Sequence, residues 1–294
     1  MRLKLLVTGR DGQVAQALLA QASDDLQVVA IGRPVLDLTD RASIERVIAA
    51  ERPDIVLNAA AYTAVDKAES EEETAFAVNA EGAGNVAAAA AAAGLPIIHI
   101  STDYVFPGDK ASPYVETDPT GPQGAYGRSK LAGEAAVAAA NPCHVILRTA
   151  WVYSAYGNNF LKTMLRVAET RDTLRVVADQ HGTPTYAPDI AEGIVAVARR
   201  LASDGNTPVG VFHMVSSGET TWAGFAEEIF RQSKALGGVH AAVEPIGTED
   251  YPTPACRPAN SRLDTARFTS VFGTRLPEWE SGVAQCLKAL GQTD

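Results

Sequence analysis

The sequence of 294 residues is short of cysteine, of positive charge and of long apolar runs. Its three cysteines, Cys143, Cys256 and Cys286, form no CxxC pair or Cys/His cluster, which argues against a zinc site and favours a reducing compartment. With 25 basic and 35 acidic residues the formal net charge is −10, so no basic stripe is available to neutralise the phosphates of a nucleic acid. The apolar start, MRLKLLVTG, is too short for a signal peptide or a membrane span. We therefore expect a cytoplasmic protein without nucleic-acid or membrane partners.

Short apolar runs alternate with helical patterns along the first half of the chain. LKLLV, QVVAI, DIVLNAA, PIIHIS and HVILRTA predict buried strands, and helices are predicted to begin near Gln13, Ser43, Thr74 and Tyr126. Repeated strand–helix units predict an α/β fold with a Rossmann-type, doubly wound parallel sheet.

From about residue 150 the loops lengthen, as in YSAYGNN and DQHGTPTYAPD, between further helices and two more strands, LRVVAD and GVFHMV. The longer loops predict a smaller C-terminal α/β domain over the carboxyl ends of the first sheet, where open α/β sheets bind ligands. We expect a NAD(P)-binding domain at 1–150, with returning segments near 188–216, and a mainly substrate-binding domain at 151–294.

The stretch VTGRDGQVAQALL follows the first strand and opens the first helix. Gly9, Gly12 and Ala15 stand at GxxGxxA spacing. Gly9 permits a tight turn, Gly12 allows a pyrophosphate to approach the backbone, and Ala15 allows close helix–strand packing. An ordinary strand–turn–helix could carry the same glycines, but the place in the first βαβ unit favours a dinucleotide. The residues of this turn predicted to bind the cofactor are Gly9, Arg10, Gly12, Gln13 and Val14.

The second strand ends at Gly32 and Arg33, where an NAD-selective site usually carries an acid. Arg33, helped by Arg10, could pair with a 2′-phosphate, although a solvated surface arginine fits the pattern nearly as well. The sequence thus favours NADPH and leaves NADH possible. Asp37 and Leu38 could meet the adenine, and Asp37 could equally cap the helix that begins near Thr39.

Tyr126 and Lys130 stand four residues apart in a predicted helix and therefore share a face. HISTDYVF ends the fourth strand with Thr102 and Asp103, which face the same crevice. Reducing a ketone requires hydride at carbon and a proton at oxygen, and a tyrosine can supply that proton if its pKa falls from about 10. We expect the Lys130 ammonium to lower the pKa of Tyr126, and Thr102 to donate to the carbonyl oxygen.

These motifs, with NAAAYTAVDKAE (58–69) and RTAWVY (148–153), stand in the order found in the extended short-chain dehydrogenase/reductases. STDYVFPG, YGRSKLAGE, WVYSAYGNNF, DQHGTPT and YPTPACRPANSRL make nearly the whole chain similar to the dTDP-4-dehydrorhamnose reductase family. The resemblance implies that NADPH or NADH reduces the C4 ketone of dTDP-4-dehydro-β-L-rhamnose. The product would be dTDP-L-rhamnose, and this is the last step of its synthesis.

The resemblance also implies a role for individual residues. Tyr126 would donate the proton, Lys130 would assist, Thr102 would orient the carbonyl, and Asp103 would lie near the sugar or the nicotinamide. The cofactor would lie beside Asn58, Ala59, Ala60, Ala61 and Tyr62. The substrate would contact Val65 and Trp151 at the sugar and Arg257, with Asn158 or Asn159, at the diphosphate. Two alternatives stay open: Trp151 as a core aromatic, and Arg257 in a structural ion pair.

The chain end, CLKALGQTD, lacks the carboxylates that some relatives place in a metal-bridged dimer. We expect no divalent metal and leave a homodimer open. Two other functions fit the same scaffold: a different nucleotide-sugar reductase or epimerase, and a non-catalytic regulatory subunit of methionine adenosyltransferase.

Overall fold

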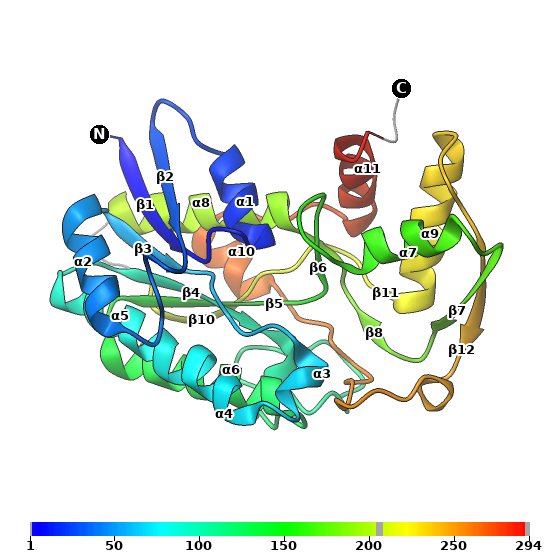
Figure 1. The fold of residues 1–294 in the computed structure, drawn as a ribbon, viewed down its shortest axis with the longest axis horizontal. Coiled ribbons are helices and arrows are strands. Elements are labelled where there is room, and N and C mark those ends of the chain that lie inside the picture. Colours follow the sequence, from blue (N-terminus) through cyan, green and yellow to red (C-terminus); the bar gives the residue numbers. More distant parts are fainter. Residues whose placement is uncertain (1, 204–207, 292–294) are drawn as a thin grey trace.

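The computed structural model describes residues 2–203 and 208–291 and confirms the predicted α/β fold (Figure 1). Within these residues the central sheet has six parallel strands in the order β10-β5-β4-β3-β1-β2. The strands are β1 (Leu3–Thr8), β2 (Leu26–Ile31), β3 (Ile55–Asn58), β4 (Ile97–Thr102), β5 (His144–Thr149) and β10 (Gly210–His213). The five runs predicted from the first half form β1 to β5, and GVFHMV adds β10 at the edge beside β5.

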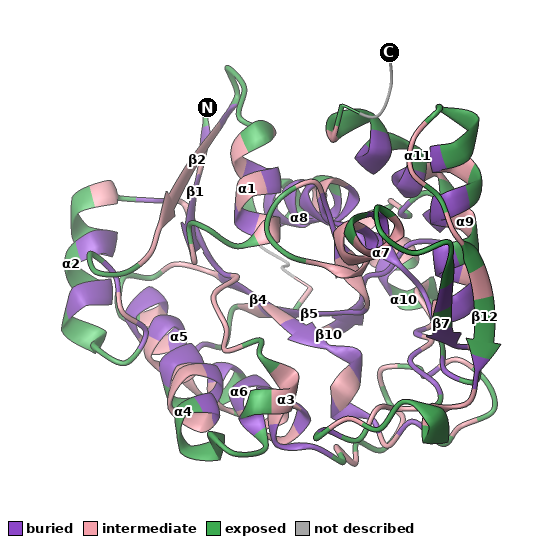
Figure 2. Cartoon of the chain, turned by 45° about the vertical axis from the view of Figure 1, so that its right-hand side comes forward, coloured by how far each residue is buried: buried purple, intermediate pink, exposed green. Residues whose placement is uncertain are grey.

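Helices cover both faces of this sheet (Figure 1). One face carries α1 (Gln13–Ala20), α8 (Ala187–Ser203) and α10 (Ala266–Phe272), and the other carries α2 (Arg41–Glu51), α5 (Ala83–Ala92) and α6 (Ala125–Ala140). Leu5 and Leu57 point toward the face covered by α1, α8 and α10, whereas Leu6 and Val56 point toward the face covered by α2, α5 and α6. This alternation explains why the strands read as continuous apolar runs. Figure 2 shows the burial concentrated on the strands and on the inward sides of the helices.

The helix predicted near Thr74 consists of consecutive pieces, α4 (Glu72–Phe76), the π-helix η1 (Ala77–Gly82) and α5. Within η1, Asn79 turns its side chain toward the loop after β3, accepting from Tyr62 N at 2.8 Å and donating to Tyr62 O at 3.0 Å. On α6, a Cβ at Gly133 would lie 2.1 Å from the carbonyl oxygen of Asn79, so glycine permits the close approach of the two helices. The π-helix thus fixes the loop after β3 relative to α6.

The C-terminal half forms a second layer of short strands and helices, on the right in Figure 1. Its strand pairs are β7 (Thr173–Val177) with β12 (Ala242–Ile246), β8 (His181–Gly182) with β11 (Thr220–Thr221), and β6 (Val152–Tyr153) with β9 (Thr185–Tyr186). Its helices are α7 (Phe160–Ala168), α9 (Trp222–Ala235) and α11 (Trp279–Ala289). They enclose a separate core around Tyr153, Phe225 and Trp279. The domain boundary near residue 150 stays a prediction, and residues 292–294 of the expected second domain lie outside the described residues.

Every helix in the described ranges is too short or too polar to cross a bilayer.

Candidate active site

The turn between β1 and α1 requires glycine at its start. Gly9 has a φ of +83°, and a Cβ there would lie 2.9 Å from Ala60 Cα, on the neighbouring strand end. Gly12 donates its N–H to the Gly9 carbonyl at 3.0 Å and precedes α1 without a side-chain cap. The first N–H groups of α1 therefore lack helical partners and, with the helix dipole, suit anionic oxygens. This cradle fits the pyrophosphate of a dinucleotide.

Two arginines lie at the outer end of this turn. Both Arg10 and Arg33 are exposed, and a Cβ at Gly32 would lie 3.4 Å from Arg10 N, so the loops after β1 and β2 adjoin. Arg10 Nε lies 3.3 Å from Asp11 Oδ1 in an exposed pair. Leu38 is buried and packs on η1.

Asp37 does not cap α2, so that alternative is wrong. Asp40 is the N-cap and accepts from Ala42 N at 3.1 Å. The carboxylate of Asp37 instead accepts from the N–H and the hydroxyl of Thr39, and these bonds, with a smaller contribution from the Arg33 charge, lower the pKa of Asp37. A contact between Asp37 and adenine stays a prediction.

The end of β4 and the start of α6 bring the predicted catalytic groups together. Thr102 Oγ1 donates to Asp103 Oδ1 at 2.9 Å. A hydrogen bond with the Thr102 side chain also acts on Tyr126, and it works to lower the pKa of the phenol. Burial raises the pKa of Asp103 to about 6, against hydrogen bonds from Ser261 and Thr102 that lower it. Asp103 Oδ2 is buried without a hydrogen-bond partner in the described part of the chain. The site therefore holds a hydroxyl, a phenol and a carboxyl with unused hydrogen-bonding capacity.

The amine of Lys130 contacts two groups of β4. Its Nζ donates to the Ile100 carbonyl at 2.7 Å and lies 3.4 Å from His99 Nε2, and burial lowers the pKa of Lys130 to about 8. Burial and the charge of Asp103 raise the pKa of Tyr126. The expected fall in the pKa of Tyr126 is therefore not met in this structure, because desolvation of the buried phenol raises it.

Trp151 lies on the second layer, at the edge of the crevice. Its ring stacks on Trp222 with centroids 3.6 Å apart, and a Cβ at Gly182 would lie 2.5 Å from it. Its φ of +48° is uncommon for a non-glycine residue. The side chain stays half-buried, so it is both a packed aromatic and an available surface.

Arg257 forms a structural ion pair, which is one of the two roles that the sequence left open. Its Nη2 donates to Asp66 Oδ2 at 2.7 Å, and its Nη1 donates to the Tyr104 hydroxyl at 3.0 Å. The Tyr104 ring stands edge-on to Tyr126 with centroids 5.6 Å apart. Asp66 follows Val65 at the start of α3 (Val65–Ala68), so this pair joins the C-terminal loop to the catalytic crevice.

The loop after β6 is tied to the cofactor turn. Gln13 Oε1 accepts from Ser154 Oγ at 2.7 Å and from Asn159 Nδ2 at 3.0 Å. Asn159 also caps α7 by accepting from Lys162 N at 3.1 Å, so its side chain is fully engaged. Asn158 is exposed. Of the two asparagines, only Asn158 has a side chain available for a diphosphate.

Sequence reasoning assigned no role to Tyr104, Asp66, Trp222 or His99. Tyr104 and Asp66 stand inside the quoted motifs STDYVF and NAAAYTAVDKAE, which was the available signal. The packing of Trp222 on Trp151 joins residues far apart in sequence and left no local signal.

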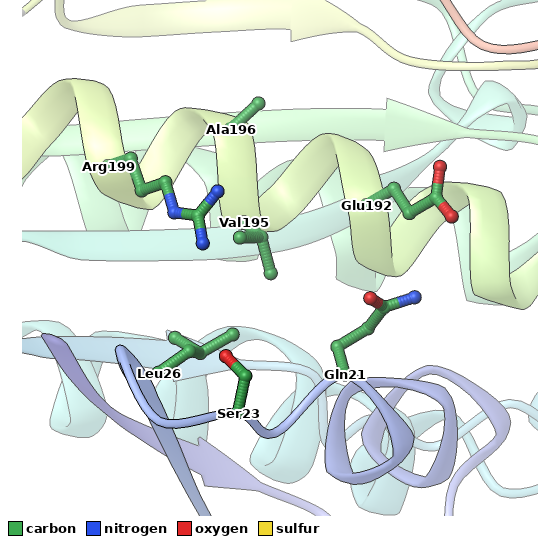
Figure 3. A pocket seen from close by; sticks show the side chains of 7 residues that line it. All are labelled: Gln21, Ser23, Leu26, Glu192, Val195, Ala196 and Arg199. Atoms are coloured by element: carbon green, nitrogen blue, oxygen red, sulfur yellow. The ribbon is translucent and has the colours of Figure 1, made fainter. Parts of the chain in front are cut away.

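The pocket in Figure 3 lies apart from these residues, between α8 and the α1–β2 loop. Its lining consists of Gln21, Ser23, Leu26, Glu192, Val195, Ala196 and Arg199, none of which was predicted to be functional. In residues 2–203 and 208–291, no group of three or more His, Cys, Asp or Glu side chains could hold a metal ion.

The dinucleotide cradle and the Thr102, Tyr126 and Lys130 set at one sheet edge define a nicotinamide-dependent oxidoreductase of the short-chain type. The family profile described as "RmlD substrate binding domain" matches residues 3–292. The chain is 52% identical to the dTDP-4-dehydrorhamnose reductase of Sinorhizobium fredii over 98% of both chains. It therefore belongs to the dTDP-4-dehydrorhamnose reductase family.

Solved structures give the same result. The Clostridium acetobutylicum dTDP-4-dehydrorhamnose reductase superposes with a TM-score of 0.89 at 39% identity, covering 98% of this chain and all of that one. The Bacillus anthracis enzyme, solved in complex with NADP, has a TM-score of 0.91 at 34% identity over 98% and 100% of the two chains.

Proposed function

We propose that the chain reduces the C4 ketone of dTDP-4-dehydro-β-L-rhamnose with NADPH or NADH, giving dTDP-L-rhamnose. The observation that carries this proposal is the meeting of Thr102, Asp103 and Tyr126, in a chain that matches a reductase of this name over 98% of its length. The intact set of polar groups, and the family, favour this reaction over an epimerase or a regulatory subunit.

When bound, the reduced nicotinamide supplies the hydride for C4. The N–H groups of Gln13 and Val14 hold the pyrophosphate, since Gly9 and Gly12 let it approach. The segment from Ala59 through Ala60 and Ala61 to Tyr62 borders the cofactor at the end of β3, where Asn79 fixes the backbone.

The proton comes from Tyr126. Its raised pKa keeps the phenol protonated at neutral pH, so a proton is available for the ketone oxygen as C4 is reduced. Thr102 would donate to the same oxygen and orient it, by turning its hydroxyl proton away from Asp103 Oδ1. Lys130 has one N–H directed to Ile100 and others left for the ribose of the cofactor.

The second layer binds the rest of the substrate. Val65 and Trp151 border the sugar, and Asp103 accepts from its hydroxyls. Arg257 and Asn158 hold the diphosphate, Arg257 through the edge of its guanidinium that is not paired with Asp66.

The cofactor choice follows from the two arginines at the turn. Arg10 and Arg33 stand on adjoining exposed loops, where either could pair with a 2′-phosphate, which favours NADPH over NADH. The relative solved with NADP supports the same preference. We place the reaction in the cytoplasm, with a dTDP-sugar and the reduced cofactor as its small-molecule partners. A homodimer stays a prediction for light scattering to test.

The test is an assay of NADPH oxidation with enzymatically generated dTDP-4-keto-L-sugar, with the product identified by its mass. Tyr126→Phe should lower kcat by at least about a hundredfold with little change in NADPH affinity. Tyr251→Phe, at an exposed position, is the matched control. Turnover by Tyr126→Phe at the wild-type rate would remove the proposed donor. Cofactor that stays bound through purification, without net oxidation, would instead support an epimerase.

A further inference from the structure

A chain of buried polar side chains runs from Lys130 across three neighbouring strands. His99 on β4 pairs in register with Asn58 on β3, and Asn58 pairs with Thr8 on β1, so the three side chains lie on one face of the sheet. Lys130 Nζ lies 3.4 Å from His99 Nε2, His99 Nδ1 lies 3.0 Å from Asn58 Nδ2, and Thr8 Oγ1 lies 2.7 Å from Asn58 Oδ1. Each of the three strand residues is at most 1% exposed. Buried polar groups at this depth must satisfy one another.

The direction of the chain is set by the orientation of the Asn58 amide. Its Oδ1, which can only accept, faces Thr8 Oγ1, so the Thr8 hydroxyl donates to it while accepting from Ala60 N–H at 3.1 Å. Its Nδ2, which can only donate, faces His99 Nδ1. A neutral imidazole has one N–H and one lone pair, so the proton of His99 is on Nε2 and points at Lys130.

An Nε2–H group can donate to Lys130 only when Nζ has a lone pair, that is, when the amine is uncharged. The uncharged amine still donates to Ile100 O and has a further N–H for a ligand. Burial, and then the charge of Lys130, lowers the pKa of His99 well below its ordinary value, which keeps the imidazole neutral.

Other charged groups surround this pair. On α6, Glu134 favours the ammonium of Lys130, but its carboxylate is held by Arg148 of β5 at 2.8 and 2.7 Å. Asp103, after β4, and Tyr126, on α6, face the crevice and influence each other. Burial outweighs Glu134 and lowers the pKa of Lys130 to about 8.

We propose that His99 is a positioning residue for the reductase: as the Nε2–H tautomer it orients Lys130 and stabilises the uncharged amine. The role deepens the proposed function and depends on it for the use of Lys130. Because an Nε2–H group that faces Nζ disfavours the ammonium, His99 sets the pH at which Lys130 carries its positive charge on the helix that also carries Tyr126.

The first test is the pH dependence of kcat for the wild type, His99→Gln and the exposed control His240→Gln. Wild-type kcat should fall as Lys130 loses its proton, near pH 8. A glutamine presents its oxygen to the ammonium, so this limb should move up by about one pH unit in His99→Gln, with little change in KM for NADPH. The control should match the wild type. A His99→Gln profile that superimposes on the wild-type profile overturns the proposal.

The second test needs no activity. ¹⁵N NMR of the imidazole nitrogens in the wild-type protein shows which nitrogen of His99 carries the proton, the signal being assigned by its loss in His99→Gln. A proton on Nε2 is expected, and a proton on Nδ1 overturns the proposal. If the wild type oxidises no NADPH, the proposed function fails while the tautomer still decides the role of His99. If His99→Gln does not fold, the imidazole signal of His99 is assigned instead by its shift in Lys130→Met, and the test stays decisive.

Discussion

Glu134→Gln removes one charge from a buried ion pair beside the active site. Glu134 Oε1 accepts from Arg148 Nε at 2.8 Å and Oε2 accepts from Nη2 at 2.7 Å, and the two side chains are 6% and 4% exposed. Ser101 also donates to Oε1, and Arg148 Nη1 has no partner in the described part of the chain. Glutamine offers one oxygen, so the guanidinium would keep one bond and an uncompensated charge.

Removing one partner of a buried pair costs about 3–5 kcal/mol. Because one hydrogen bond survives, we expect the lower end, about 3 kcal/mol. The matched control is Glu72→Gln, since Glu72 accepts from Arg128 Nε and Nη2 at 3.1 and 2.8 Å at the surface, with side chains 47% and 41% exposed. Exposed pairs contribute about 0–1 kcal/mol, so this change should be nearly neutral.

Urea unfolding followed by far-ultraviolet circular dichroism measures both variants against the wild type. Linear extrapolation gives the free energy of unfolding, and unchanged slopes show that the same surface is exposed in each variant. Losses that agree within about 0.5 kcal/mol for Glu134→Gln and Glu72→Gln would refute the reasoning from burial.

Three further outcomes follow from the site. Gly9→Ala should raise the Kd for NADPH at least about tenfold in a fluorescence titration, because its Cβ would lie 2.9 Å from Ala60 Cα, whereas Gly94→Ala, with φ +70° and open space around it, should not change that Kd. Arg33→Ala should weaken NADPH about tenfold more than NADH, and equal losses would separate Arg33 from the 2′-phosphate. The pKa of Asp103 is about 6 in the fold against 3.8, so its stabilising contribution is present below about pH 4 and is lost by about pH 6. Urea unfolding of the wild type against Asp103→Asn should therefore show the wild type losing about 3 kcal/mol relative to the variant between these values, and parallel curves would contradict the shift.

Much of the fold is local in the sequence. The apolar runs of β1, β3, β4 and β5 are buried on both faces, whereas the edge strand β2 is only partly buried, and the shortness of the runs distinguishes them from helices. The need for glycine at position 9 also follows from a tight turn, although the contact with Ala60 that enforces it is not visible in the chain order. Periodicity likewise placed Tyr126 and Lys130 on one helix.

The errors arise where tertiary contacts compete. Tyr126 and Lys130 share a helix, yet Lys130 Nζ donates to Ile100 O and lies beside His99, both on β4, and burial is the main cause of both pKa shifts. Asp37 and Asp40 are equally good caps by residue type, and only the backbone path selects Asp40.

The most direct test of the account uses NADPH deuterated at the transferred position of nicotinamide C4, with dTDP-4-dehydro-β-L-rhamnose as substrate. We predict a dTDP-rhamnose that carries one deuterium at C4, formed together with one oxidised cofactor per sugar, and near-complete loss of this product with Tyr126→Phe. A product without deuterium at C4, or an unreduced ketone after cofactor oxidation, would contradict the account.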